Sequence, residues 1–355
     1  MKVLVTGHNG YIGSVMVPIL QSAGHRVVGL DSFYFEDCLL GEEDQGVLAI
    51  RKDVRDVEVS DLEGFEAVVH LAALCNDPIG DLNADWTHDI NYQASVRLAR
   101  MAREAGVRRF LYASSCSMYG ASGGSEALSE EAPLRPLTAY ALSKVRTEEG
   151  VAPLADAEFS PVFMRNATAY GFSPHLRADV VLNNLVCWAH TTGKIRIMSD
   201  GTPWRPIVHV QDISRAFAAA LVAPRDTIHN QAFNVGADAE NYQVSELAEI
   251  VRATVPGCTV EYAESAGPDP RSYRVSFQKL ARAFPDFKPH WNASFGAKEL
   301  YAALQECGVT LQDFQGRMYI RLTQLKHLLE GGYLDDTLRW HRSESEVRRR
   351  RSRGR

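Results

Sequence analysis

The chain has 355 residues, of which 45% are hydrophobic and 23% are charged. These values are typical of a globular protein and exclude a collagen-like or wholly disordered chain. At about 150 residues per domain, the length predicts about two domains. The net charge is −6, although the last 14 residues alone carry seven Arg and two Glu. Most of the chain is therefore acidic, which argues against a general nucleic-acid-binding protein.

The sequence also suggests where the protein works. No apolar run approaches the roughly 20 residues that span a bilayer, and the N-terminus lacks the charged and apolar regions of a secretory signal. The six cysteines are scattered without a C-x-x-C pair, so neither a metal site nor a disulfide framework is expected. Free thiols are typical of a reducing compartment. We therefore expect a cytoplasmic protein that uses no metal ion and binds no membrane.

The first half of the chain alternates short apolar runs with helical segments. Five runs have the composition of strands, at residues 2–6, 25–31, 46–51, 65–71 and 109–113. A helix is expected between the first two runs, with Gly24 at its end and a kink or a locally irregular turn at Pro18. An amphipathic helix is expected at 96–105. Strands that alternate with helices at this spacing predict an α/β fold with a parallel sheet.

Beyond about residue 165, Gly and Pro interrupt the pattern more often. A helix is expected at 242–252 with Ser245 near its N-cap, and two or three helices are expected at 295–340. The chain after Trp340 is rich in Arg, Ser and Glu and has no apolar periodicity, which predicts a disordered tail. We therefore divide the chain into segments 1–165, 166–340 and 341–355.

A glycine-rich loop follows the first predicted strand. Its sequence, Gly7-His-Asn-Gly10-Tyr-Ile-Gly13, has G-x-x-G-x-x-G spacing and precedes a helix. Gly7 allows a tight turn, Gly10 lets backbone N–H groups approach a pyrophosphate, and Gly13 lets the helix pack close to the sheet. The N-terminus of the helix then attracts phosphate charge. The loop predicts a dinucleotide site.

Two acidic residues near strand ends extend this site. Asp31 ends the second strand, where a carboxylate accepts hydrogen bonds from both ribose hydroxyls and repels a 2′-phosphate, so NAD is favoured over NADP. The alternative for Asp31 is a surface turn residue. Asp53 and Val54 follow the third strand, where a carboxylate can accept a hydrogen bond from the adenine amino group. A solvated loop residue is an equally good interpretation of Asp53.

Tyr140 and Lys144 form a Y-x-x-x-K pair. On a helix these residues share one face, and an ammonium beside a phenol lowers the phenol pKa from about 10 toward neutrality. Tyr140 is therefore a candidate general base for the oxidation of an alcohol, and Lys144 can also reach a ribose hydroxyl. The alternative is an ordinary exposed pair on a helix.

A serine-rich segment, Ser114–Gly120, directly follows the fifth strand. The carboxyl end of a parallel strand faces the ligand crevice, so the Ser115 hydroxyl is expected to bridge the substrate and Tyr140. The neighbouring serines can instead satisfy the backbone of a turn. Nothing in the sequence marks Cys116 as a nucleophile, and we interpret it as a small residue that only fills space in the packing.

In this order, the motifs resemble those of the extended short-chain dehydrogenase/reductases. Within these, the chain is similar to the nucleotide-sugar epimerases and dehydratases, of which UDP-glucose 4-epimerase is the best-known type. The resemblance covers about residues 1–290 and includes four further segments, His70-Leu-Ala-Ala73, Arg165–Gly171, Trp204–Asp212 and Phe233–Gly236.

The resemblance implies a fold, a cofactor and partners. It implies a Rossmann-type doubly wound parallel sheet in residues 1–165, to which segments from the later half of the chain return. It also implies a smaller C-terminal α/β domain that binds the substrate. The implied substrate is a nucleotide-diphosphate sugar and the implied cofactor is NAD. A homodimer is also implied.

The resemblance further assigns roles residue by residue. The catalytic group is Ser115, Tyr140 and Lys144. The cofactor contacts, besides Tyr140 and Lys144, are Gly7, Asn9, Gly10, Tyr11, Ile12, Gly13, Asp31, Asp53, Val54, Leu71, Ala72, Ala73 and Asn91. The substrate contacts are Asn76, Ser115, Ser117, Asn166, Asn183, Asn184, Arg205 and Arg271. The two arginines are suited to a diphosphate, and Arg274 is an alternative to Arg271.

Departures from the family pattern narrow the range of reactions that we expect the chain to catalyse. Family 4,6-dehydratases carry Asp-Glu at the positions of Cys116 and Ser117, so the elimination of water, which needs a positioned acid and base, is disfavoured here. The segment Asn76-Asp77-Pro78 is atypical of the family. It either contacts and recognises the sugar, or it forms an ordinary loop. Pro206 replaces the usual acidic residue after Arg205.

The sequence therefore favours a nucleotide-sugar epimerase that acts through a transient keto-sugar, with hydride transfer at C4. The alternatives are a reductase of a nucleotide-linked keto-sugar, a decarboxylase, and a non-catalytic NAD-binding regulator. The intact set of Ser115, Tyr140 and Lys144 weighs against the regulator. The Arg-rich tail is expected to be solvated rather than to bind nucleic acid, because it has no aromatic residues to stack on bases.

Overall fold

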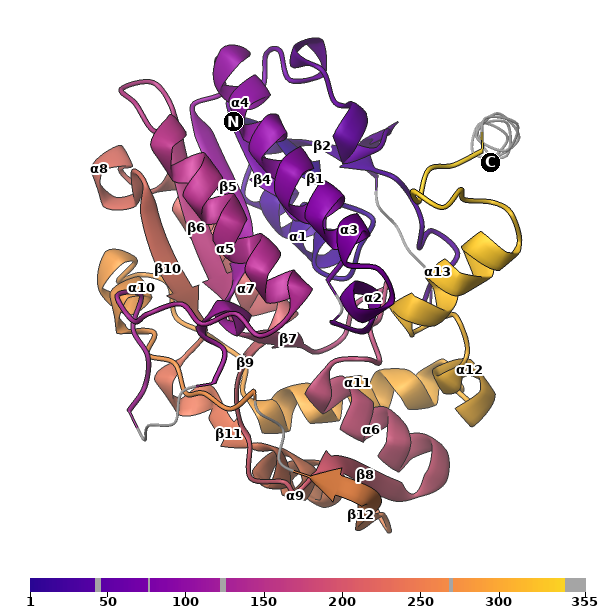
Figure 1. The fold of residues 1–355 in the computed structure, drawn as a ribbon. Helices are drawn as coiled ribbons and strands as arrows, with labels where there is room; N and C mark the ends of the chain where they lie inside the picture. Colours follow the sequence, from indigo (N-terminus) through magenta and orange to yellow (C-terminus); the bar gives the residue numbers. More distant parts are fainter. Residues whose placement is uncertain (42–45, 76, 122–125, 268–270, 342–355) are drawn as a thin grey trace.

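The computed structural model describes residues 1–41, 46–75, 77–121, 126–267 and 271–341 (Figure 1). Its central strands are β1 (Lys2–Thr6), β2 (Arg26–Asp31), β3 (Leu48–Arg51), β4 (Ala67–His70), β5 (Arg109–Ser115), β6 (Ser160–Asn166) and β10 (Gln231–Val235). They form one parallel sheet with the order β10-β6-β5-β4-β1-β2-β3. The expected α/β fold with a parallel sheet is confirmed.

Helices cover both faces of this sheet. In β1, Val3 and Val5 belong to the core on one face and Leu4 to the core on the other, and all three are fully buried. Strands that are covered on both sides are stable as continuous apolar runs. The covering helices are α1 (Gly13–Ser22) and α7 (Val210–Val222) on one face, and α4 (Ala94–Glu104) and α5 (Ala139–Val151) on the other.

The strand order reverses at the centre of the sheet, between β1 and β4. In open parallel sheets, ligands bind outside the carboxyl ends of the strands at such a switch point. The glycine loop follows β1 and the serine-rich segment follows β5. Both therefore lie at the edge of the sheet where a ligand is expected.

A smaller lobe follows β6 in the chain. Its strands are β7 (Thr168–Tyr170), β8 (Lys194–Ser199), β9 (Trp204–His209), β11 (Asn241–Gln243) and β12 (Thr259–Gly267), in a three-stranded sheet (β11-β9-β7) and a two-stranded sheet (β12-β8). The helices that share its core are α6 (Val181–Thr192), α9 (Val244–Thr254), α11 (Ala293–Glu306) and α12 (Leu311–Gln315). The remaining helices are α2 (Asp77–Leu82), α3 (Ala84–Thr87), α8 (Arg225–Ile228), α10 (Gln278–Ala283) and α13 (Arg321–Glu330).

Two helix ends test the sequence predictions. Helix α1 continues through Pro18, and Gly24 follows its end with a φ of +84°, a conformation that glycine adopts without strain. Helix α9 has Gln243 as its N-cap, so Ser245 lies near the N-cap, as predicted, but does not itself cap the helix. Gln243 and Glu246 form a capping box, in which each side chain accepts a backbone N–H of the other residue.

The C-terminal part of the described chain returns to the first half of the protein (Figure 1). Leu325 and Leu328 of α13, together with Leu334 and Leu338, belong to the same core as α4. The C-terminal end of the predicted segment 166–340 therefore packs with the first domain, because these leucines cover the parallel sheet and not the smaller lobe. The Arg-rich residues 342–355 lie outside the described part of the chain.

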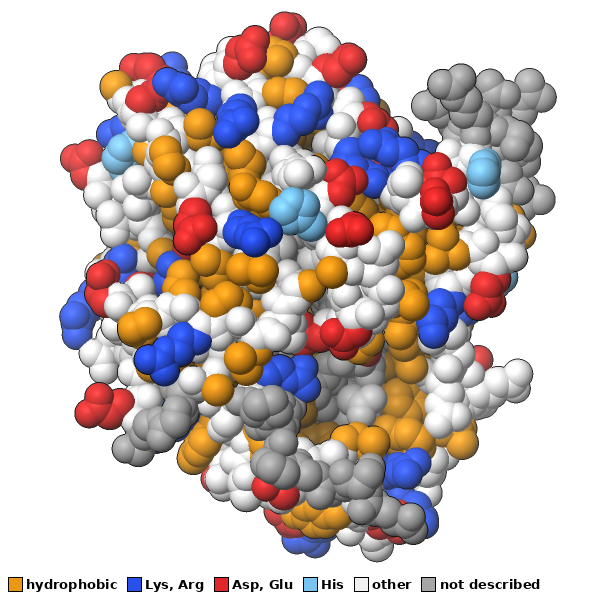
Figure 2. All heavy atoms as spheres, in the orientation of Figure 1, with side chains coloured by type: hydrophobic (Ala, Val, Ile, Leu, Met, Phe, Trp, Pro, Cys, Tyr) orange, Lys and Arg blue, Asp and Glu red, His pale blue; other side chains and the backbone are white. Residues whose placement is uncertain are grey.

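Other sequence expectations concern the surface and the thiols. All six cysteines are free. On the face shown in Figure 2, acidic and basic side chains are interspersed and no extended basic surface forms. Within the described ranges, no helix combines the length and apolar character needed to cross a membrane. The same residues contain no group of three or more His, Cys, Asp or Glu arranged to hold a metal ion.

Candidate active site

A cavity of about 1240 Å³ opens at the carboxyl ends of the parallel strands. Pockets for a single small molecule usually measure roughly 300–1,000 Å³, so this cavity has room for more than one ligand. Loops after β1, β2, β4 and β5 line part of it, and residues of α6, β8 and β9 from the smaller lobe line the rest. The cavity thus joins the two halves of the protein.

The glycine loop forms one wall. The loop residues that line the cavity are Gly7, Asn9, Gly10, Tyr11, Ile12 and Gly13, opposite Leu71, Ala72 and Ala73. Gly7 has a φ of +74°, and a Cβ there would lie 2.7 Å from the backbone nitrogen of Ala72. A Cβ at Gly13 would lie 2.2 Å from the carbonyl oxygen of Gly7. Only glycine fits at these positions, and the resulting cradle suits a close-packed pyrophosphate.

Asp31 lies at the end of β2 and lines the cavity beside this loop. Its Oδ2 accepts a hydrogen bond from the backbone N–H of Asn9 at 3.1 Å, and its Oδ1 accepts one from Phe33 at 2.7 Å. These bonds hold the carboxylate in place, and each oxygen can accept a further donor. The two hydroxyls of a ribose are suitable donors, so the residues here fit NAD.

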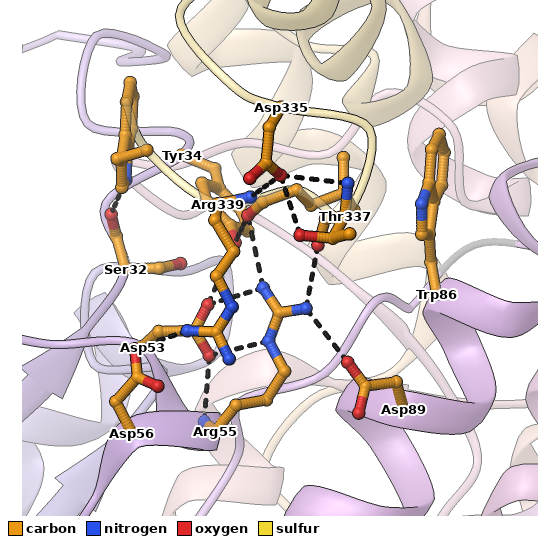
Figure 3. A network of polar contacts seen from close by, with 12 residues as sticks. Ser32, Tyr34, Asp53, Arg55, Asp56, Trp86, Asp89, Asp335, Thr337 and Arg339 are labelled. Carbon is orange, nitrogen blue, oxygen red and sulfur yellow. Dashed lines mark hydrogen bonds and ion pairs between the residues drawn. The ribbon is translucent and has the colours of Figure 1, made fainter. Parts of the chain in front are cut away.

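Asp53 and Val54 also line the cavity, and Asp53 is engaged by a neighbour (Figure 3). Its two carboxylate oxygens accept hydrogen bonds from Arg55 Nε at 3.0 Å and Nη2 at 2.7 Å. Arg55 also pairs with Asp89 and donates to the carbonyl oxygens of Thr337 and Leu338. Much of the Asp53 carboxylate is therefore used within the protein, which leaves less of it for adenine than the sequence suggested.

Ser115, Tyr140 and Lys144 all line the cavity. Ser115 ends β5, and the other two lie in the first two turns of α5. Thr138 caps this helix by accepting the backbone N–H of Ala141 at 3.1 Å, which fixes where Tyr140 lies. Lys144 Nζ donates to the carbonyl oxygen of Ala113 at 2.6 Å and lies 5.5 Å from the centre of the Tyr140 ring.

The electrostatics of this group differ from the sequence prediction. Burial raises the pKa of Tyr140 well above its usual range, and the Ser115 hydroxyl and the Arg177 guanidinium only oppose this rise. Burial also lowers the pKa of Lys144 to about 8. The predicted fall of the phenol pKa is thus not produced by the protein alone, because desolvation of the buried phenol is the dominant effect.

We expect Lys144→Met to change how stability depends on pH. The pKa of Lys144 is about 8 in the folded protein, whereas a free lysine titrates near 10.4, so the unfolded chain binds more protons between these values. Over this range the wild type should gain about 3 kcal/mol of stability relative to Lys144→Met. Urea unfolding at about pH 7 and about pH 10 measures this gain. A difference between the two proteins that stays constant with pH would contradict it.

A buried ion pair lies one helical turn beyond Lys144. Glu148 and Arg165 are each less than one-tenth exposed, and Arg165 Nη2 donates to Glu148 Oε2 at 2.7 Å. The Ser114 hydroxyl donates to Glu148 Oε1 at 2.6 Å. Arg165 also donates to the hydroxyl of Tyr119 at 3.1 Å. This network joins α5 to β5 and β6, so it sets the distance between Ser115 and the Tyr140 helix.

Two predicted contact residues are used inside the protein instead of lining the cavity. Asn91 accepts the backbone N–H of Leu74 at 2.8 Å and donates to its carbonyl oxygen at 3.0 Å. Asn183 accepts the backbone N–H of Gly171 at 3.0 Å and donates to the Tyr11 hydroxyl at 3.1 Å. Both are fully buried, so they position the backbone around the cavity. The predicted contact Asn76 lies outside the described residues.

The other predicted substrate residues line the cavity, namely Ser117, Asn166, Asn184, Arg205 and Arg271. Asn166 lies at the end of β6, and its Oδ1 is buried without a hydrogen-bond partner in the described part of the chain. A buried acceptor of this kind calls for a donor on a ligand. Arg271 Nη1 pairs with Asp77 at 2.8 Å, whereas Arg274 packs over the Trp204 ring and does not line the cavity.

The cavity also contains basic residues that sequence reasoning missed, namely Arg177, Arg196 and Arg321. Arg177 forms a bidentate pair with Asp179 at 2.9 and 3.2 Å. No local motif surrounds these residues, because chain segments far apart in the sequence bring them to the cavity. Cys116 is fully buried, its Sγ donates to the carbonyl oxygen of Arg165, and burial raises its thiol pKa, so it is no nucleophile.

Known proteins share this fold and these motifs. The model of the "NAD dependent epimerase/dehydratase family" matches residues 3–236. UDP-glucose 4-epimerase of Corynebacterium glutamicum is 29% identical over 297 residues, which cover 79% of this chain and 88% of the relative. The enzyme of the same name from Mycolicibacterium smegmatis is 32% identical over 252 residues, 68% of this chain and 78% of the relative.

Solved structures agree with these relatives. MoeE5, solved in complex with UDP-glucuronic acid and NAD, has a TM-score of 0.74 and 28% identity, and the match covers 86% of this chain and 99% of that one. A 5,6-dehydratase of NDP-hexosamine, TunA, has a TM-score of 0.76 at 22% identity over 86% of this chain and 98% of that one, which shows a common fold. The chain therefore belongs to the NAD dependent epimerase/dehydratase family, which confirms the resemblance seen in the sequence and the expectation of NAD as cofactor.

Proposed function

We propose that this protein is an NAD-dependent nucleotide-sugar epimerase that acts through a transient 4-keto-sugar. The observation that carries the proposal is the position of Ser115, Tyr140 and Lys144. They lie in one cavity between a glycine loop that fits NAD and a lobe that presents Arg205 and Arg271. The two relatives named UDP-glucose 4-epimerase support the same reaction.

The residues of the chain would bind and orient both ligands. The glycine loop and the N-terminus of α1 hold the pyrophosphate of NAD, and Asp31 holds the adenosine ribose. Arg205 and Arg271 bind the diphosphate of the substrate through charge-assisted hydrogen bonds. When bound, NAD supplies a hydride acceptor and a positive charge that favours the phenolate of Tyr140.

Proton transfer at the sugar is the task of Tyr140. Its phenolate takes the proton of the C4 hydroxyl as the hydride leaves C4, and the Ser115 hydroxyl stabilises the developing oxyanion. The Lys144 ammonium, 5.5 Å from the centre of the Tyr140 ring, would help to stabilise the phenolate once NAD is bound. The hydride taken up by bound NAD would return to the other face of the keto-sugar, and Tyr140 would return the proton, so the reaction would be redox-neutral.

The structure supports epimerisation over 4,6-dehydration. Cys116 and Ser117 stand where family dehydratases carry two carboxylic acids, and the Cys116 thiol is buried against the backbone of Arg165. Neither side chain is an acid or base of the strength that loss of water requires. A homodimer and a cytoplasmic location stay predictions of the sequence and the family resemblance.

Stoichiometry tests the proposal. Purified protein should interconvert two nucleotide sugars, with UDP-glucose as the first candidate, without consuming added NAD or NADH. Oxidation of one NADH for each product molecule would contradict an epimerase and show a keto-sugar reductase. Chromatography of the sugar nucleotides together with absorbance at the NADH band gives both quantities.

A further inference from the structure

Arg321 is the first residue of α13, and it lies far outside the part of the chain that the family model matches. Its side chain is 95% buried, yet it lines the cavity. Nη2 donates to the carbonyl oxygen of His175 at 2.7 Å, while the buried Nη1 has no hydrogen-bond partner among the residues that the structure describes. The face of Phe35 lies 4.5 Å from the guanidinium carbon.

The charge of Arg321 is not balanced by a carboxylate. No residue that the structure describes forms an ion pair with it, and the nearby Asp179 is paired bidentately with Arg177. A buried charge without a partner costs free energy, and arginine does not lose its proton to avoid that cost. A guanidinium with a free N–H at the wall of a ligand cavity therefore favours the binding of an anionic group of the ligand.

Its neighbours place Arg321 beside the glycine loop. His175, which accepts its hydrogen bond, has its ring 3.1 Å from the side-chain amide of Asn9 in that loop. Ser173, two residues earlier, donates to the carbonyl oxygen of Tyr11 at 2.8 Å. By contrast, Arg196 and Arg205 belong to strands of the smaller lobe. Arg321 is thus next to the cradle for a pyrophosphate, and Arg177, whose charge also acts on Tyr11 of the loop, is already paired with Asp179.

We propose that Arg321 is a phosphate-binding residue of the NAD site, which donates from its guanidinium to the diphosphate of the cofactor. The inference rests on the proposed placement of NAD along the glycine loop. It adds the C-terminal helix α13 to the cofactor site. A guanidinium is well suited to this contact, because its parallel N–H groups match phosphate oxygens.

The segment that follows α13 supports this assignment, because it holds the adenosine side of the same cavity (Figure 3). Trp340 Nε1 donates to the carbonyl oxygen of Ser32 at 2.7 Å, and the Tyr34 hydroxyl donates to the carbonyl oxygen of Leu338. Ser32 and Tyr34 line the cavity. Arg55 bridges the same segment to Asp53. The segment that follows Arg321 is thus tied to the cofactor wall.

The test compares two diphosphates in the full-length Arg321→Gln protein. ADP-ribose carries the diphosphate of NAD without nicotinamide, and UDP carries the diphosphate of the substrate. We expect Arg321→Gln to weaken ADP-ribose binding by about tenfold to a hundredfold in calorimetry, the range for a lost charged hydrogen bond. UDP binding should be unchanged, and the NAD content of the purified protein should fall. Arg321→Lys should bind ADP-ribose with intermediate affinity.

Lys326→Gln is the matched control, since it removes an exposed cation from the same helix. It should bind both diphosphates as the wild type does. Weaker UDP binding with unchanged ADP-ribose binding would overturn the proposal and assign Arg321 to the substrate. Unchanged binding of both, or an Arg321→Gln protein that does not fold, would also overturn it and indicate a structural role. Because no turnover is measured, these outcomes do not depend on the proposed reaction.

Discussion

Tyr140→Phe is expected to reduce turnover by at least about 10²- to 10⁴-fold, the range for loss of a positioned general base. The substitution removes one oxygen atom from a side chain that lines the cavity between Ser115 and Lys144. The fold and NAD binding should be retained, because the ring itself remains. Steady-state rates of sugar interconversion, together with NAD content after denaturation, measure both parts of this prediction.

The pH profile gives a second readout of the same substitution. In the wild type the rate should rise with pH as the Tyr140 phenol loses its proton, because the phenolate is the base. The residual rate of Tyr140→Phe should show no such rise. Tyr92→Phe is the control, since it also removes a phenol hydroxyl but Tyr92 does not line the cavity. A Tyr140→Phe protein with wild-type rates would favour a non-catalytic NAD-binding protein.

Glu148→Ala is expected to cost about 3–5 kcal/mol of stability, the largest effect on unfolding that we predict. The substitution leaves Arg165 as a buried guanidinium without its carboxylate, and it removes the acceptor of the Ser114 hydroxyl. Because Glu148 lies one turn beyond Lys144 on α5, activity should fall as well. Chemical denaturation measures the free energy of unfolding.

A double substitution separates the charge from the packing. Glu148→Met with Arg165→Met removes both charges while keeping apolar volume, so it should recover much of the stability lost in Glu148→Ala. If the double variant is as unstable as the sum of its single variants, the two residues do not act as a pair. That result would contradict the account of the network.

Local patterns predicted much of the fold and part of the site. β1 was found because a fully buried parallel strand is a continuous apolar run. The glycine loop and the Tyr140–Lys144 pair were found because turn geometry and helical spacing act over only a few residues. The structure places these features around one cavity.

Features that depend on distant parts of the chain could not be predicted. Arg55 meets the carbonyl oxygen of Leu338, which is 283 residues away, and no local pattern encodes such a contact. Asn183 looked like a substrate residue, but its amide completes the hydrogen bonds of Gly171 and Tyr11. The pKa of Tyr140 was predicted in the wrong direction for the protein alone, because spacing along a helix does not report burial.

The central claim is that a hydride leaves C4 of the sugar and returns to the same carbon. The most direct measurement uses a nucleotide sugar with deuterium at C4 in ordinary water, with the product analysed by mass spectrometry and NMR. The account predicts an epimerised product that keeps its deuterium at C4. Loss of the deuterium to water, or its appearance in released NADH, would contradict the account.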